Sequence, residues 1–343
     1  MRAVWRWTRR DTLAALGQAG VLLAAPGLAP AADMTYFRIG TGGTLGTYFP
    51  IGGILANAIS NPPGSRPCDE GGSCGVPGLV AVAQTSNGSI DNLAAVAEGR
   101  IESGFSQADI AYWAYSGTMM FADRGPAANL RAITNLYRES VQLVARADAG
   151  IATVADLAGK RVSLDLEGSG TLIDARSVLA AYGVSEAGLE AVFLGAEQAS
   201  DAMLAGALDA FFIVSGTPTA SVADLADQLD IVVVPITGEP AARMVREQPF
   251  FSHDFVPHGT YRGVGTVETL SVGALWIVGA EVAEDLVYGI TSALWHENTR
   301  RLLDAGHEKG RAIRLESALT GVSVPLHPGA ERYYREKGML QAP

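Results

Sequence analysis

The sequence is poor in the residues on which metal sites and many catalytic sites depend. It has two cysteines, Cys68 and Cys74, and five histidines that are scattered along the chain without the spacing of metal ligands. After the export-like start described below, no apolar stretch reaches the ~20 residues that cross a bilayer. We therefore expect no metal, no cofactor and no membrane-spanning helix in the main part of the chain.

Positive charge is also in the minority. The chain has 25 Lys and Arg against 36 Asp and Glu, which gives a formal net charge of −11. Loss of residues 1–31 would remove four arginines and one aspartate and move this charge to −14. Such a surface repels nucleic acid, so we expect no nucleic-acid partner. It also slows the approach of an anionic solute, so any attraction for an anion must be local to its site.

The first residues have the pattern of an export signal. Four arginines precede residue 11, residues 12–29 are mostly apolar, and residues 29–31 are small enough for cleavage near Ala31. Residues 8–13 resemble a twin-arginine signal, although Thr12 stands where that pattern usually has phenylalanine. We expect residues 1–31 to be an export signal and the mature protein to be periplasmic. A membrane anchor is the alternative.

The two cysteines are six positions apart in a glycine-rich segment. A turn of this kind brings two sulfurs together easily, and an oxidising compartment favours their bonding. We expect a disulfide between Cys68 and Cys74. The alternative is a metal site, which would need a nearby histidine or a second cysteine pair, and the neighbouring sequence offers neither.

The main part of the chain repeats one unit, in which a strand leads through a polar loop into a helix. This order is typical of an α/β fold with a mostly parallel sheet and helices on both faces. The expected strands are 37–40, 79–83, 104–107, 161–166 and 209–214, and helices are expected at 90–98, 108–115 and from 171 to 182. Further helices are expected at 282–304 and 328–337.

About 310 mature residues are too many for a single hydrophobic core. Residues 141–145 look like a strand that crosses into a second lobe, and residues 272–278 look like a strand that belongs with the first. We therefore assign residues 34–138 and 239–343 to lobe 1 and residues 139–238 to lobe 2. A hinge between the two lobes follows from this arrangement.

The segment 38–53 is the most informative part of the sequence. An alternating strand ends in the glycine-rich loop 42–46, and Pro50 is expected at the first helical position, where proline is favoured. The start of a helix has unpaired backbone N–H groups and about half a positive charge. The segment therefore predicts a site for a carboxylate or phosphate that needs no catalytic side chain.

This loop and several later segments resemble the TAXI family, the solute receptors of TRAP transporters. The other matching segments are 106–111, 156–163, 168–171 and 324–330. The resemblance implies a two-lobed periplasmic-binding-protein fold, type II-like, and a TRAP-type membrane permease as partner. It implies a small carboxylate or amino acid as ligand, such as glutamate, glutamine or 2-oxoglutarate. Carried over by motif, the ligand contacts would be Thr44, Thr47, Tyr48, Ser169, Gly170 and Thr171.

In open α/β sheets, ligands bind beyond the carboxyl ends of the strands. The other polar positions at expected strand ends are Ser86, Asn87, Gln107, Asp109, Ser215 and Gly216. Each loop has an alternative role, because Ser, Thr and Asn are also the preferred helix caps. Tyr48 is either a ring at the mouth of the cleft or a core aromatic. Asp109 is either a partner for a ligand ammonium group or a first-turn helix acid.

These residues are hydrogen-bond donors and acceptors, and they do not form a catalytic set. The loop 40–47 lacks the lysine of a Walker motif, Ser169 lacks the glycine of a nucleophile elbow, and His296-Glu297 lacks a second histidine. The sequence thus predicts a periplasmic solute receptor that is not an enzyme. The alternatives are an exported ligand-sensing module for a signalling partner and an exported enzyme on the same scaffold.

Overall fold

The computed structural model describes residues 34–341. The expected export signal, residues 1–31, lies outside this described part. Within it, no helix combines the length and the apolar character that a membrane span requires.

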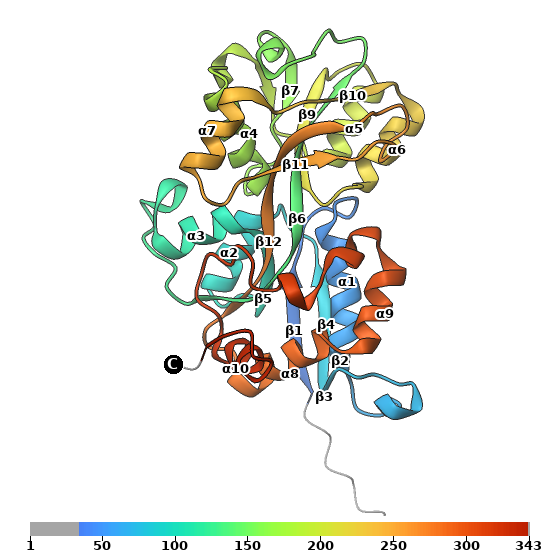
Figure 1. Cartoon of the computed structure of the whole chain (residues 1–343), viewed down its shortest axis with the longest axis vertical. Helices are drawn as coiled ribbons and strands as arrows, with labels where there is room; N and C mark the ends of the chain where they lie inside the picture. The colour runs from blue at the N-terminus through green and yellow to red at the C-terminus, as the bar shows by residue number, and fades with distance from the viewer. Residues whose placement is uncertain (1–33, 342–343) are drawn as a thin grey trace, which may run out of the picture. The chain divides into compact units, whose positions relative to one another are not determined.

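Strands and helices alternate along the described chain, as the sequence predicts (Figure 1). The strands are β1 Thr35–Gly40, β2 Ser60–Asn61, β3 Val76–Pro77, β4 Leu79–Gln84, β5 Ser103–Gln107, β6 Leu130–Arg146, β7 Arg161–Ser163, β8 Glu190–Val192, β9 Ala210–Ser215, β10 Ile231–Val234, β11 Ser252–Val256 and β12 Val267–Gly279. The α-helices are α1 Tyr48–Ile59, α2 Ser89–Ala97, α3 Ala108–Ser116, α4 Gly170–Ala181, α5 Ala196–Leu204, α6 Ala220–Gln228, α7 Gly238–Glu247, α8 Glu284–Leu294, α9 Glu297–Gly306 and α10 Pro328–Glu336.

One sheet runs through the described chain in the order β4-β1-β5-β12-β6-β9-β7-β8, while β10 pairs with β6 and β11 with β12. We call the part around β1, β4 and β5, with α1 to α3, the first half and the part around β7, β8 and β9, with α4 to α6, the second half. On one side β1 is parallel to β4 and β5, and on the other β7 is parallel to β8 and β9. Between them β6 and β12 pair antiparallel and pass from one half to the other (Figure 1). The predicted α/β fold with mostly parallel sheet on either side of two crossings is confirmed.

The core of the first half forms around the inward face of β1 and β12. Phe37 and Ile39 are buried while Tyr36 is 62% exposed, as the two-residue period of a strand requires. Trp276 of β12 packs edge-on against Phe37 and Phe105, with ring centroids 6.5 and 6.0 Å apart. Aromatic rings in this geometry stabilise a core beyond their area burial. A crossing strand thus contributes the largest side chain of this core.

A separate core in the second half includes Val141 and Val214, and two residues of α7, Ala241 and Met244, are buried in it. The expected lobe boundary at residue 239 does not match this packing, because α7 lies beyond that boundary and packs on lobe 2. The positions of the crossing strands alone do not show which core the apolar face of α7 joins. We keep the division into two lobes as a proposal, with the return crossing placed in β12.

Two helix boundaries differ from those expected. Helix α1 begins at Tyr48, two residues before Pro50, and proline is still tolerated there because the first-turn N–H groups have no intrahelical partner. The expected helix 282–304 is two helices, α8 and α9. The break occurs at His296, whose Nδ1 accepts a hydrogen bond from the Asn298 N–H at 3.1 Å and so caps α9.

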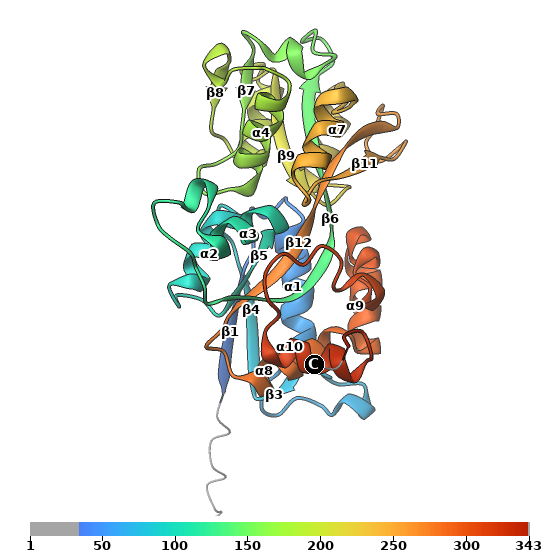
Figure 2. The same ribbon diagram turned by 60° about the vertical axis from the view of Figure 1, so that its left-hand side comes forward.

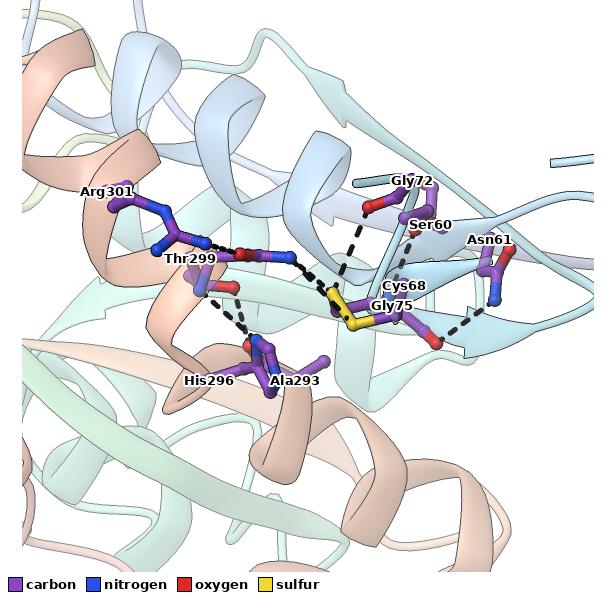
Figure 3. The surroundings of a disulfide bond; sticks show 12 residues. Ser60, Asn61, Cys68, Gly72, Gly75, Ala293, His296, Thr299 and Arg301 are labelled. Carbon is purple, nitrogen blue, oxygen red and sulfur yellow. Dashed lines mark hydrogen bonds between the residues drawn. A yellow bond between two sulfur atoms is a disulfide. The ribbon is translucent and has the colours of Figure 1, made fainter. Parts of the chain in front are cut away.

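The disulfide between Cys68 and Cys74 is present, with the two Cα atoms 4.7 Å apart (Figure 3). The expectation that no histidine lies near these cysteines is wrong for the folded structure. The start of α9 brings His296 close, so that a ring nitrogen and both sulfurs lie within 4.8 Å of one another. Because the sulfurs are bonded to each other, they are not the thiolates that bind a metal.

Candidate functional site: a cavity between the two halves

A cavity of about 180 Å³ lies where loops of the two halves meet. Its lining from the first half is Gly42, Gly43, Leu45, Gly46, Thr47, Tyr48, Ser86, Asn87, Gly88, Ser89 and Gln107, with Glu139 from the crossing strand β6. Its lining from the second half is Asp165, Leu166, Ser169, Gly170, Thr171, Gly195, Ala196, Glu197, Gln198, Ile213, Val214 and Ser215. This volume is below the ~300–1,000 Å³ of drug-sized sites, so it fits a small metabolite.

Five helices begin at this cavity. The residues that precede their first turns, all of which line it, are Thr47 before α1, Gly88 before α2, Gln107 before α3, Ser169 before α4 and Gly195 before α5. Each strand-loop-helix unit places its helix start at the carboxyl end of a strand, so the topology gathers these ends together. A helix start brings a partial positive charge and N–H groups without an intrahelical partner. Some of these groups are already paired, since the Ile90 and Asp91 N–H groups of α2 donate to the Gly168 carbonyl. The described lining contains no Lys or Arg, so the helix starts supply the positive partial charge in it, beside three acids.

Hydrogen bonds join the halves around the cavity. The Thr47 hydroxyl donates to the Gly216 carbonyl at 2.8 Å, and the Ile90 N–H donates to the Gly168 carbonyl at 3.0 Å. In Figure 2, α2 and α3 of the first half lie below α4 of the second half, on either side of this contact. The halves also meet through apolar contacts, since Ile173 of α4 packs against the cluster that contains Leu93 and Ile110.

Most of the residues predicted from the sequence lie at this cavity. Nine of them line it: Thr47, Tyr48, Ser86, Asn87, Gln107, Ser169, Gly170, Thr171 and Ser215. Their contact with a ligand remains a prediction.

Three predicted residues do not line the cavity. Thr44 is exposed at the tip of its loop, because the chain turns at Gly43–Gly46 and directs the loop tip outward. Gly216 uses its carbonyl to accept the Thr47 hydroxyl. Asp109 is fully buried and interacts with Asp174.

Several cavity hydroxyls also cap helices or strands, which was the alternative role. Ser169 Oγ accepts a hydrogen bond from the Leu172 N–H at 3.1 Å, and Thr171 Oγ1 accepts from the Val214 N–H at 3.0 Å. A hydroxyl that accepts one bond keeps its own O–H to donate. Capping and ligand binding are therefore compatible at these two residues.

Three acids in the lining were missed: Glu139, Asp165 and Glu197. The sequence predictions rest on glycines and hydroxyls that follow strands, whereas Glu139 lies within the long strand β6. Its neighbours Arg138 and Ser140 are polar, so the sequence carries no signal that Glu139 is buried.

Glu139 is the most unusual of these acids. It is 1% exposed, and the Tyr48 hydroxyl donates to its Oε2 at 2.6 Å. Burial raises the pKa of Glu139 to about 8, although the Tyr48 hydrogen bond and the charge of Lys309 oppose this shift. Burial also raises the pKa of Asp165 to about 6. Glu139 is thus mostly protonated at neutral pH, whereas Asp165 is mostly ionised.

Glu139→Gln is expected to reduce the amount by which the free energy of unfolding falls at high pH, compared with the wild type. The pKa of Glu139 is higher in the folded protein, about 8, than its ordinary 4.5. Its stabilising proton is therefore fully held below pH 4.5 and lost as the pH rises through 8. The wild type should lose roughly 2–4 kcal/mol more than the variant between about pH 5 and 9, measured by urea unfolding.

The control for this test is Glu98→Gln, which changes an exposed acid paired with Arg100. It should keep the pH dependence of the wild type. An equal pH dependence of Glu139→Gln and wild type would contradict the assignment of the raised pKa.

Comparison with solved structures gives matches at low identity. One is the alkanesulfonate-binding protein SsuA from Xanthomonas axonopodis pv. citri bound to MOPS, at 16% identity over 89% of this chain and 85% of that chain, with a TM-score of 0.41. Another is a mutant of ArgBP from T. maritima, at 16% identity over 79% of this chain and 94% of that chain, with a TM-score of 0.46. A third is a protein from Bordetella bronchiseptica, at 15% identity over 90% of this chain and 83% of that chain, with a TM-score of 0.51. At these identities the similarity concerns the fold.

The crossing strands, the parallel part of the sheet on either side of them and the cavity define the class, which is an α/β protein of the periplasmic-binding-protein fold. A sequence model of the NMT1-like family matches residues 39–338, and the chain belongs to that family.

Proposed function

We propose that the protein is a solute receptor that closes its two halves over a small carboxylate or amino acid. The observation that supports this most is the gathering of five helix starts around one small cavity. Helix starts bind carboxylates through N–H groups and need no cationic side chain. Charge-assisted hydrogen bonds at ~1.5–3 kcal/mol each reach the ~8 kcal/mol of a micromolar complex once ordering costs are subtracted.

The acids in the lining favour a ligand that also has an ammonium group. Asp165 and Glu139 both face the cavity, and the pKa of Asp165, raised to about 6, leaves it mostly ionised at neutral pH. A dicarboxylate that lacks an ammonium group would place a negative charge near this acid, whereas an amino acid offers its ammonium group as a hydrogen-bond donor. Among the expected ligands we therefore favour glutamate and glutamine over 2-oxoglutarate.

The transport role rests on two further arguments. The two long strands β6 and β12 are the covalent crossings between the halves, and bending there would open the cavity. The export-like start and the motif resemblance to the TAXI family support a periplasmic location and delivery to a TRAP-type membrane permease. In this mechanism, the permease distinguishes loaded from empty receptor by the relative placement of the lobes, and the ligand undergoes no bond change.

A thermal-shift screen of the mature protein tests the ligand class. The panel contains L-glutamate, L-glutamine, 2-oxoglutarate and succinate. A ligand present at 100 times its dissociation constant should stabilise the protein by ~2.7 kcal/mol, because it binds only the folded state. We expect the amino acids to raise the melting temperature more than succinate does.

A matched pair of variants locates the effect. Ser169→Ala removes a hydroxyl that lines the cavity, and Thr44→Ala removes one that does not. The first should weaken the ligand-induced shift and the second should leave it unchanged. A panel in which no acid changes the melting temperature would contradict the proposal.

A further inference from the structure

Two buried carboxyl groups meet between the halves, beside the cavity. Asp109 is the second residue of α3 in the first half, and Asp174 lies in the second turn of α4 in the second half. Both are 0% exposed, and each contributes to the pKa shift of the other by direct interaction. Neither lines the cavity. Two acids that are far apart in sequence thus come together only where the halves touch.

Three of the four carboxyl oxygens of this pair have no hydrogen-bond donor among the described residues. Gln107 Nε2 donates to Asp174 Oδ2 at 3.1 Å, which is a further contact between the halves. Asp174 Oδ1 and both carboxyl oxygens of Asp109 accept no hydrogen bond from an N–H or O–H group of the described residues. One proton on Asp174 Oδ1, donated to Asp109, would satisfy an oxygen on each side. Two ionised carboxylates in this position would repel each other at low dielectric.

The surroundings favour the same protonation. Burial, followed by the charge of Asp109, raises the pKa of Asp174 well above its usual range. Burial raises the pKa of Asp109 as well, but the interaction with the Asp174 side chain, followed by the first N–H groups of α3, acts in the opposite direction. The proton therefore belongs to Asp174.

The other charged and titratable groups near the pair come from three elements. Glu139 of β6 adds negative charge that raises the pKa of Asp174, and its Oε2 accepts a hydrogen bond from the hydroxyl of Tyr48 of α1. Lys309, in the turn Glu308–Ala312, acts on Glu139, and no salt bridge of the described residues reaches Asp109 or Asp174. No basic side chain of the described residues neutralises this pair, so a bound proton would relieve the repulsion between the two carboxylates.

We propose that Asp109 and Asp174 form a proton-binding site that is assembled when the halves meet, so that closure over the solute takes up one proton. The inference rests on the proposed function, because it requires that the halves separate to admit the solute. In the open form Asp174 regains water and loses Asp109, and its proton leaves at neutral pH. Solute affinity then falls as the pH rises, by up to about tenfold per pH unit between the open and closed pKa values of Asp174.

A closed form that needs no solute gives the most direct test. A Cβ atom at Gly216 would lie 2.9 Å from Thr47 Cγ2 and 2.8 Å from Lys309 Cγ. Cysteines at positions 47 and 216 are therefore close enough to form a disulfide across the halves once the Lys309 side chain shifts. In the protein with Thr47→Cys and Gly216→Cys, ¹³C NMR of labelled Asp carboxyls is followed during a pH titration, before and after selective reduction of the new disulfide. We expect one Asp carboxyl that is protonated at pH 7 in the locked form and ionised after reduction.

Two further variants assign this signal. Asp174→Asn in the locked protein should remove it, and Asp227→Asn, an exposed acid on α6, should keep it. A locked protein in which every Asp titrates in its ordinary range would overturn the inference. A raised pKa that persists unchanged after reduction would overturn the link to closure.

The solute provides an independent measurement, which also serves if the engineered disulfide does not form. Calorimetric titration with L-glutamate in phosphate and in Tris, whose ionisation enthalpies differ, reports proton uptake on binding. We expect uptake of up to one proton in the wild type and a smaller uptake in Asp174→Asn. Equal proton uptake in the wild type and in Asp174→Asn would contradict the inference. Failure of L-glutamate to bind would count against the proposed ligand only. The titration of the locked protein would then decide whether closure takes up a proton.

Discussion

Gly170→Val is expected to lower solute affinity by about 100-fold, which corresponds to ~2.7 kcal/mol. Gly170 is the first residue of α4, and a Cβ atom there would overlap Gln107 Oε1 and lie 2.9 Å from Ser89 Oγ. Both neighbours belong to the opposite half. Gln107 cannot turn aside freely because it is buried and donates to Asp174. The new side chain therefore holds the halves apart while each half keeps its own core.

The matched control is Gly188→Val. Gly188 lies in the short 3₁₀ turn Glu186–Gly188, and a Cβ atom there meets nothing within 4 Å. Calorimetric titration with L-glutamate should give wild-type affinity for the control and strongly reduced affinity for Gly170→Val, with unchanged circular dichroism in both. Equal affinity of the two variants would show that closure at Gly170 is not needed for binding.

Trp276→Ala is expected to lower the free energy of unfolding by about 4 kcal/mol, the usual cost of removing a large buried aromatic side chain. Trp276 is 0% exposed, contacts the rings of Phe37 and Phe105, and donates from Nε1 to Ser103 Oγ at 3.1 Å. Its removal leaves a cavity on the crossing strand β12 and removes the hydrogen bond that Ser103 Oγ accepts, while the Ser103 hydroxyl still donates to the Arg38 carbonyl at 3.0 Å. Urea unfolding followed by circular dichroism measures the change.

Tyr36→Ala is the control, since Tyr36 is an aromatic residue on the same sheet with 62% of its surface exposed. It should change the free energy of unfolding by less than about 1 kcal/mol. A comparable loss in both variants would mean that the core is not centred on the crossing strand.

Much of the fold could be predicted because local patterns and topology agree. Strand 79–83 and the helix after Gly170 carry the two-residue or helical apolar period together with glycine-rich loops, and both lie where they were expected. The boundary near residue 239 could not be placed, because Ala241 and Met244 are apolar in either lobe and only three-dimensional packing decides which core they join. The break at His296 depends on a side-chain cap, which the helical periodicity on either side of it does not reveal.

The cavity residues divide in the same way. Thr47, Ser169 and Thr171 could be predicted because strand ends of a parallel sheet meet at one edge. Glu139 and Asp174 could not, since one lies inside a strand and the other inside a helix, where the sequence gives no sign of what faces them. Their roles arise from contacts between segments that are distant in sequence. Thr44 lies outside the cavity lining, because motif resemblance places a residue in a loop without fixing the direction of its side chain.

Native mass spectrometry of the mature protein, incubated with a pool of amino acids and dicarboxylates, tests the central proposal most directly. We predict a complex with one small acid per protein molecule, recovered chemically unchanged, and no such complex for Gly170→Val. Absence of any bound acid from the wild type, or equal binding by Gly170→Val, would contradict the account of two halves that close over a solute.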